Sequence, residues 1–100
     1  MIYVDDMRRL AVARGGSRRA RWSHMFTDQD SQEELHEFAA RLGLRREWFQ
    51  NERWLETHPW RCHYDVTDTV RARALQLGAE PITYPRGMSE MIERRKAARS

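Results

Sequence analysis

Cysteine and long apolar runs are nearly absent from this chain of 100 residues. The single cysteine, Cys62, cannot form an internal disulfide, which agrees with a reducing compartment and favours a small buried side chain at this position. The longest apolar runs are only a few residues, far below the roughly 20 that a membrane-spanning helix needs. Two carboxylates follow close after the first residue, where an export signal would carry positive charge. We therefore expect a soluble cytoplasmic protein without a membrane partner.

Motifs that define a reaction by themselves are also missing. The sequence contains no phosphate loop, dinucleotide-binding loop, zinc finger or serine elbow. One hundred residues allow a single domain, 1–100, with one modest core, and exclude a second domain. Candidate sites must therefore be found among the residues that gather at the ends of the expected strands and helices.

Lysine is scarce as well, because seventeen arginines and one lysine supply the positive charge. The segment 7–20 has no acidic residue and contains Gly-Gly-Ser between arginines, a composition typical of a flexible basic loop. Such a loop can contact the phosphates of a nucleic acid or nucleotide; the alternative is a solvated loop without a ligand. A second basic segment, 94–100, is expected to be a frayed tail. The predicted phosphate-binding residues in and beside the loop are Arg14, Arg18, Arg19 and Arg21.

Two segments have the spacing of amphipathic helices. The range 31–42 begins with a capping-box pattern, Ser31 with Glu34. The range 67–77 begins with Thr67, a residue type that caps helices. Apolar residues at helical spacing predict the buried positions Leu35, Phe38, Leu42, Val70, Ala74 and Leu77.

Four short segments are rich in the β-branched and aromatic residues that favour strands. They are expected at 2–5, 21–26, 62–66 and 82–84. Together the segments predict an α/β or α+β fold, in which a single small mixed sheet is covered by two main helices and followed by a short C-terminal helix.

The triplet His63-Tyr64-Asp65 concentrates more reactive side chains than any other point of the chain. It lies at the expected carboxyl end of a strand, where open sheets place their ligands. His63 and Asp65 point to the same strand face, so the carboxylate can orient the imidazole. Tyr64 and Arg61 are predicted beside them as binding residues. The alternative is that Tyr64 lies in the core and that the triplet only braces the turn into the next helix.

His24 and Asp5 are predicted to join this triplet. Each ends an expected strand, and sheets gather such ends into one crevice. The order strand-His, helix, Leu-Gly also occurs twice in the chain, which gives His24 and His63 equivalent positions if the two units lie parallel. We therefore expect His24, His63 and at least one of Asp5 and Asp65 in one pocket, as candidate catalytic residues.

These side chains leave three functions open. A nucleotide- or nucleic-acid-binding protein needs only the basic loop, the tail and aromatic residues for base stacking, although four clustered aromatics also suit core packing. An enzyme would use His24, His63 and Asp65 as acid/base groups or as ligands of a divalent metal, for hydrolysis or transfer at a phosphoester. A protein-interaction module is the third reading. The phosphate-directed binding protein is the first choice, and the sequence predicts neither the metal nor the oligomeric state.

Five short motifs occur in order along the chain. They read Ile-Tyr-Val-Asp, Trp-Ser-His, Glu-Leu-His-x-Phe-Ala-x-x-Leu-Gly-Leu, Trp-Phe-Gln and His-Tyr-Asp-Val. In this combination the range 2–84 resembles a family of small uncharacterised bacterial and phage proteins, classed as a domain of unknown function. The resemblance implies membership of that family and no particular activity.

Overall fold

The computed structural model describes residues 1–12 and 19–99. Its strands are β1 (Ile2–Val4), β2 (Arg9–Val12), β3 (Arg19–Thr27), β4 (Tyr64–Thr67) and β5 (Glu80–Pro81). Its α-helices are α1 (Glu33–Arg41), α2 (Asp68–Gln76) and α3 (Arg86–Arg99). Short 3₁₀ turns at Arg46–Trp48, Glu52–Trp54 and Pro59–Arg61 connect α1 to β4.

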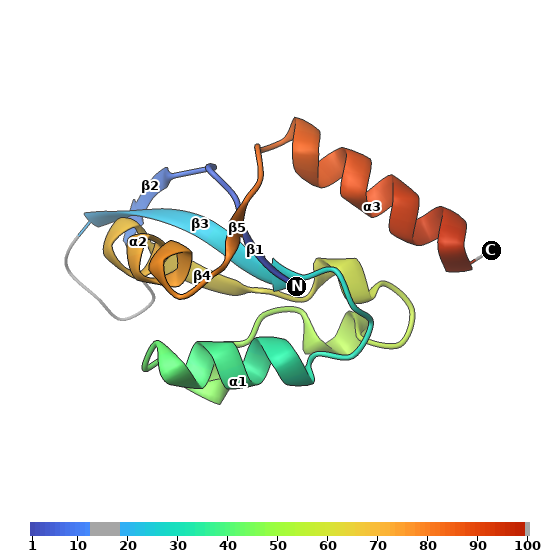
Figure 1. Cartoon of the computed structure of the whole chain (residues 1–100), viewed down its shortest axis with the longest axis horizontal. Coiled ribbons are helices and arrows are strands. Elements are labelled where there is room, and N and C mark those ends of the chain that lie inside the picture. Colours follow the sequence, from blue (N-terminus) through green and yellow to red (C-terminus); the bar gives the residue numbers. More distant parts are fainter. Residues whose placement is uncertain (13–18, 100) are drawn as a thin grey trace.

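The long strand β3 is the centre of one mixed sheet, to which the described residues contribute five strands (Figure 1). Trp22 pairs with Arg9 of β2 on one edge and with Thr67 of β4 on the other, and Met25 is shared in the same way between β1 and β4. β1 and β2 therefore follow one another along one edge of β3, and β4 occupies the opposite edge. All three are antiparallel to β3, whereas β5 adds to β1 in parallel.

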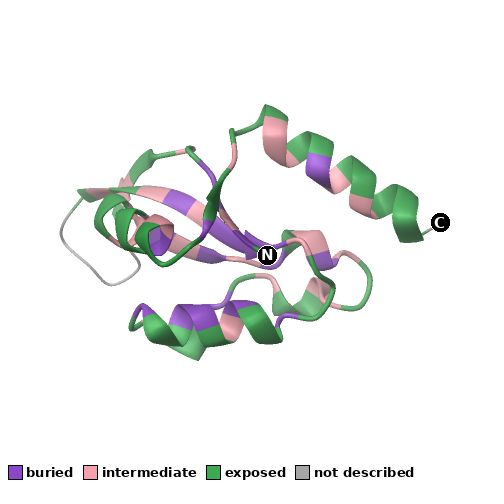
Figure 2. Cartoon of the chain, in the orientation of Figure 1, coloured by how far each residue is buried: buried purple, intermediate pink, exposed green. Residues whose placement is uncertain are grey.

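The main core lies on one face of this sheet. Val4, Met25 and Tyr64 are buried there against α1 and α2, which contribute Leu35 and Ala74. Figure 2 shows that burial is concentrated in the sheet and on the side of α1 that faces it. Neighbouring residues of a strand point to opposite faces of the sheet. The residues that alternate with Val4, Met25 and Tyr64 along their strands therefore lie on the other face, called here the second face.

The second face carries several polar side chains, and α3 is the helix nearest to it. Tyr3 and Phe26 stack there with ring centroids 5.8 Å apart. In Figure 1, α3 lies on the opposite side of the sheet from α1. Most of α3 is exposed, and Met91 is its buried residue. The predicted class is confirmed as α+β, with one mixed sheet between helices. In the described part of the chain, no helix is both long enough and apolar enough to span a bilayer.

The helices agree with the predicted apolar stripe better than with the predicted ends. Leu35, Phe38, Leu42 and Ala74 are buried as expected. Val70 is only partly buried, and the prediction for Leu77 is wrong, because α2 ends before it and leaves the side chain 39% exposed.

The two predicted helix starts have different outcomes. The capping box is wrong: Gln32 is the N-cap of α1 without a capping side chain, and Ser31 Oγ accepts only a 3.4 Å bond from the Glu33 N–H. Thr67 does cap α2, and its hydroxyl accepts the Val70 N–H at 3.3 Å.

The strands differ from the prediction mainly at their ends. β2 was not predicted, and it occupies part of the segment expected as a basic loop. β4 begins at Tyr64 rather than Cys62, because Cys62 ends a 3₁₀ turn and His63 is bridged to Gln50 instead of to β3. β5 precedes the expected range 82–84, and α3, expected to be short, extends through residues 94–99 of the predicted tail. Arg14 and Arg18 lie outside the described residues.

Candidate metal centre

Antiparallel pairing places three ionisable residues in one row across the sheet. Asp5 follows β1, and its N–H donates to the carbonyl of His24 on β3 at 3.0 Å. His24 is in turn the register partner of Asp65 on β4. Neighbouring strands lie roughly 4.8 Å apart, so the three side chains meet on the second face. His63 joins them because it lies two residues from Asp65, where an isolated bridge to Gln50 holds its backbone.

Asp5 fixes the orientation of the His24 ring. Its Oδ2 lies 2.6 Å from His24 Nδ1, and its Oδ1 accepts the backbone N–H groups of His24 at 2.9 Å and Met7 at 3.2 Å. The Asp5 side chain is fully buried. Both carboxylate oxygens of Asp5 are therefore engaged in hydrogen bonds, and the role of Asp5 is to hold the His24 ring in place. Nδ1 of His24 carries the proton that this bond needs, so Nε2 is the ring nitrogen left for another partner.

His63 has the same arrangement with a different acceptor. Its Nδ1 lies 2.8 Å from the carbonyl oxygen of Arg61, and because a carbonyl can only accept, Nδ1 must donate. Its Nε2 lies 3.3 Å from Asp65 Oδ1, where a protonated Nε2 donates to the carboxylate and a metal could take the place of that proton. The ring centroids of His24 and His63 are 4.7 Å apart, and the ring planes are nearly perpendicular, at 89°. Because Nδ1 of each ring has its own acceptor, Nε2 is the atom of each ring that a metal could bind in place of a proton.

His24, His63 and Asp65 together have the composition of an open metal site. One ligand atom from each lies within 4.8 Å of the other two. Ligand atoms on a tetrahedral zinc ion lie roughly 3.3 Å apart, so side-chain movements of about 1–2 Å would bring them into range. Two imidazoles with one carboxylate suit catalytic zinc or non-haem iron(II). Metal-binding histidines usually donate their other ring nitrogen to a carboxylate or carbonyl, as these two do.

The charges of the cluster depend on one another. Burial lowers the pKa of His24, but the hydrogen bond and charge of Asp5 and the charge of Asp65 outweigh it and raise that pKa. Burial raises the pKa of Asp65, but the hydrogen bond from His63 and the charges of both imidazoles outweigh it and lower that pKa. The row therefore attracts positive charge, which a proton on His24 or a bound cation can supply.

A cleft of about 440 Å³ opens beside the two imidazoles. It lies between the second face of the sheet, the turns before β4, and one side of α3. Its lining residues are His24, Phe26, Asn51, Trp60, Arg61, His63, Met88, Ile92 and Lys96. A water or substrate that binds a metal held by the cluster would therefore enter from this cleft.

The structure brings together four predicted site residues, Asp5, His24, His63 and Asp65, but not for the predicted reason. The expected parallel arrangement of two repeated units is wrong, because β3 and β4 are antiparallel. His24 lies within β3, and it meets Asp65 as a direct cross-strand neighbour.

The predicted binding residues are more scattered. Arg61 lines the cleft. Tyr64, by contrast, is 1% exposed and lies in the core, where its hydroxyl is 2.9 Å from His36 Nδ1. Arg19 and Arg21 lie on β3 outside the cleft, and Arg21 donates to the carbonyl of Arg8.

Sequence reasoning did not find the part of the cleft that α3 supplies. Met88, Ile92 and Lys96 face it, and their spacing of four residues places them on one side of a helix. This spacing was the available signal. It was missed because the segment was expected to be a short helix followed by a frayed tail.

The fold and the cluster define a small α+β domain with a histidine–carboxylate site beside a cleft. The chain belongs to the family described as Protein of unknown function (DUF4031), whose model matches residues 2–98. The membership predicted from the motifs is therefore confirmed. No curated protein and no solved structure matches the chain. The function must accordingly be argued from the site itself.

Proposed function

We propose that this protein is a metal-dependent hydrolase whose divalent ion is held by His24, His63 and Asp65. The observation that carries the proposal is the pair of preset imidazoles. Nδ1 of each ring lies against a fixed acceptor, and one ligand atom from each of His24, His63 and Asp65 lies within 4.8 Å of the other two. In an accidental cluster of surface groups, there is no reason for both imidazoles to have an acceptor at Nδ1.

Three protein ligands favour catalysis over a structural role. Structural zinc sites are closed by four protein ligands, whereas catalytic sites have three and leave a position for water or substrate. The cleft lies beside His24 and His63, where that position would open. A bound divalent ion lowers the pKa of a coordinated water and polarises a substrate oxygen, which is the chemistry of hydrolysis.

The protein residues have separate roles in this proposal. Nε2 of His24, Nε2 of His63 and a carboxylate oxygen of Asp65 bind the ion. Asp5 and the Arg61 carbonyl position the two rings, because they fix which nitrogen is protonated. Nucleic-acid binding by the basic loop is a separate prediction, since Arg19 and Arg21 do not line the cleft.

Metal binding by single-residue variants tests the site directly. The purified protein, stripped with a chelator and titrated with Zn²⁺ by calorimetry, should bind one ion per chain. His63→Ala and Asp65→Asn should weaken binding by about 100-fold or more, because each removes one of three ligands. The matched controls are His58→Gln and Asp68→Asn, whose side chains lie outside the cluster.

The same titration can contradict the proposal. If the parent protein binds no divalent ion tightly, or if the His58 and Asp68 variants lose as much affinity as the His63 and Asp65 variants, the cluster is not a metal site. Repeating the titration with Mn²⁺ and with Fe²⁺ under anaerobic conditions identifies which ion the geometry prefers.

A further inference from the structure

We propose that the substrate is a small phosphate monoester whose organic group lies against α3. This inference rests on the proposed metal centre and adds the chemical class of the substrate. It follows from the mixed lining of the cleft, which combines the imidazoles of the proposed metal centre and two cationic side chains with apolar side chains from α3, the sheet and the turn before β4.

The charged lining of the cleft favours an anion. Arg61 and Lys96 are cations, Lys96 also lying 3.6 Å from Glu93 Oε1 on α3, and none of the cleft-lining residues among those described is acidic. The Arg61 guanidinium lies over the Trp54 ring at 4.7 Å. In the described part of the chain its N–H groups have no hydrogen-bond acceptor. A stacked guanidinium with unused donors suits phosphate, whose oxygens accept parallel hydrogen bonds.

The other walls favour an apolar group. Met88 and Ile92 line the cleft from α3, Phe26 lines it from the sheet, and Trp60 from the turn before β4. Methionine adapts to irregular ligands, and an aromatic ring provides a stacking surface. A volume of about 440 Å³ lies in the range of pockets for small molecules. The cleft therefore has room for a single small organic phosphate.

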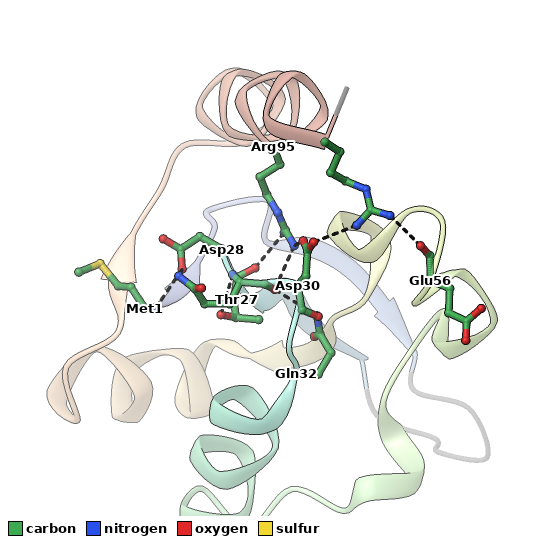
Figure 3. A network of polar contacts seen from close by, with 9 residues as sticks. Met1, Thr27, Asp28, Asp30, Gln32, Glu56 and Arg95 are labelled. Atoms are coloured by element: carbon green, nitrogen blue, oxygen red, sulfur yellow. Dashed lines mark hydrogen bonds and ion pairs between the residues drawn. The ribbon is translucent and has the colours of Figure 1, made fainter.

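The position of α3 is fixed by contacts outside the cleft (Figure 3). Arg95 donates to the carbonyls of Thr27 and Gln29, each at 3.0 Å, and Arg99 donates to the carbonyl of Glu56 at 2.7 Å. These bonds connect the last turns of the helix to β3 and to the turns that carry Trp60. The apolar side chains of α3 are therefore held in place beside the cleft.

The reaction is the hydrolysis of R–O–PO₃²⁻ by water to R–OH and HPO₄²⁻. The water oxygen forms a bond to phosphorus, and the bond between phosphorus and the ester oxygen breaks. The leaving oxygen keeps that electron pair and takes one proton, and the second proton of the water remains on phosphate. No oxidant or further reactant is needed. Arg61 contacts the non-bridging oxygens, and Met88 and Ile92 contact R.

Substrate analogues separate binding from leaving-group reactivity. The zinc-loaded protein is titrated with phenylphosphonate, methylphosphonate and benzoate, and hydrolysis of p-nitrophenyl phosphate is measured in parallel. Phenylphosphonate should bind about tenfold or more tightly than methylphosphonate, because it adds the apolar group that α3 contacts. It should also bind more tightly than benzoate, which has the ring without the phosphonate.

Variants assign the two halves of the cleft. Ile92→Ala and Met88→Ala should each weaken phenylphosphonate about tenfold and leave methylphosphonate unchanged. Arg61→Ala should weaken both phosphonates about equally. Leu10→Ala, which removes an exposed apolar side chain of β2, is the control that should change neither. Circular dichroism verifies that each variant is folded.

The outcomes distinguish this inference from the metal proposal. Zinc binding with no phosphonate affinity, or with benzoate binding more tightly than phenylphosphonate, overturns the substrate class and leaves the metal centre standing. Equal affinity for the two phosphonates overturns the role of α3. Failure to bind any divalent ion overturns the proposed function and this inference with it.

Discussion

Among single residues, Asp5 determines which nitrogen of His24 is available. An Asp5→Asn variant keeps the size of the side chain but can present an amide N–H to Nδ1. His24 would then be protonated on Nε2, where it cannot bind a metal. We expect Zn²⁺ affinity to fall by about 10- to 100-fold, the usual effect of losing such an orienting partner. Calorimetry measures the affinity, and ¹⁵N NMR of the imidazole reports the tautomer.

The control for this variant is Asp6→Asn. Asp6 Oδ1 accepts the Tyr84 N–H at 2.6 Å, a bond that an asparagine carbonyl can also accept, so the metal affinity should be unchanged. An Asp5→Asn protein that binds zinc as tightly as the parent, or that keeps the proton of His24 on Nδ1, would show that Asp5 has only a structural role.

His36 provides a pH-dependent contribution to stability outside the cluster of His24, His63 and Asp65. Burial first, and the charge of Arg46 second, lower the pKa of His36 from its ordinary value of 6.5. The unfolded chain therefore binds a proton more readily than the folded chain. The contribution of neutral His36 is present above pH of about 6.5 and is lost as the pH falls through its lower folded pKa.

A His36→Gln variant removes this titration. The difference in free energy of unfolding between the parent and the variant should become smaller as the pH is lowered from about 8 to about 5. His24, whose raised pKa has the opposite effect, is present in both proteins and cancels in the difference. Urea unfolding at several pH values measures it. A difference that is constant, or that grows on acidification, contradicts the prediction.

At the scale of helices and strands, short sequence patterns predicted the features that depend on interactions between residues close in sequence. The buried stripe of α1 and the Thr67 cap of α2 follow from residues within a few positions of one another. The pairing of Asp5, His24 and Asp65 does not. It depends on the antiparallel register of β1, β3 and β4, which no short segment encodes. The sequence indicated that these residues were reactive, but the cross-strand row that joins them came from the fold.

The basic tail shows the same limit. Its arginines have the composition of a solvated segment, and only the folded chain provides the carbonyl acceptors of Thr27, Gln29 and Glu56. Those bonds give the last turns of α3 a partner, although the helix buries little apolar surface of its own. For that reason the α3 wall of the cleft could not be predicted from composition.

Arg95 is the residue that should matter most for the docking of α3. Its side chain is 9% exposed, and two of its three hydrogen bonds are made to backbone carbonyls, the third reaching Asp30 Oδ1 at 3.4 Å. Arg95→Leu leaves those carbonyls without this partner, so the free energy of unfolding should fall by about 1–3 kcal/mol. Hydrogen exchange of the α3 amides should also become faster. Arg94→Leu, at an exposed neighbouring position, should change stability by no more than about 0.5 kcal/mol. Equal effects of the two substitutions would contradict the docking role.

For the whole molecule, the cluster links parts of the chain that are distant in sequence. Asp5 follows β1, His24 lies within β3, and His63 and Asp65 lie just before β4 and on it. These residues meet only in the folded state. An ion bound to them therefore stabilises the fold, because the unfolded chain cannot assemble the site. This coupling gives a test of the metal centre that needs no substrate and no measured activity.

Zinc should raise the thermal stability of the parent protein. At a free concentration of about 100 times the dissociation constant, binding adds about 2.7 kcal/mol to the free energy of unfolding. For a domain of this size that corresponds to a rise in Tm on the order of 10 °C. A chelator should reverse the rise, and His63→Ala should abolish it, whereas His58→Gln should retain it. If zinc shifts the Tm of the His63 variant as much as that of the parent, the stabilising ion binds elsewhere, and the row of Asp5, His24 and Asp65 serves the protein without a metal.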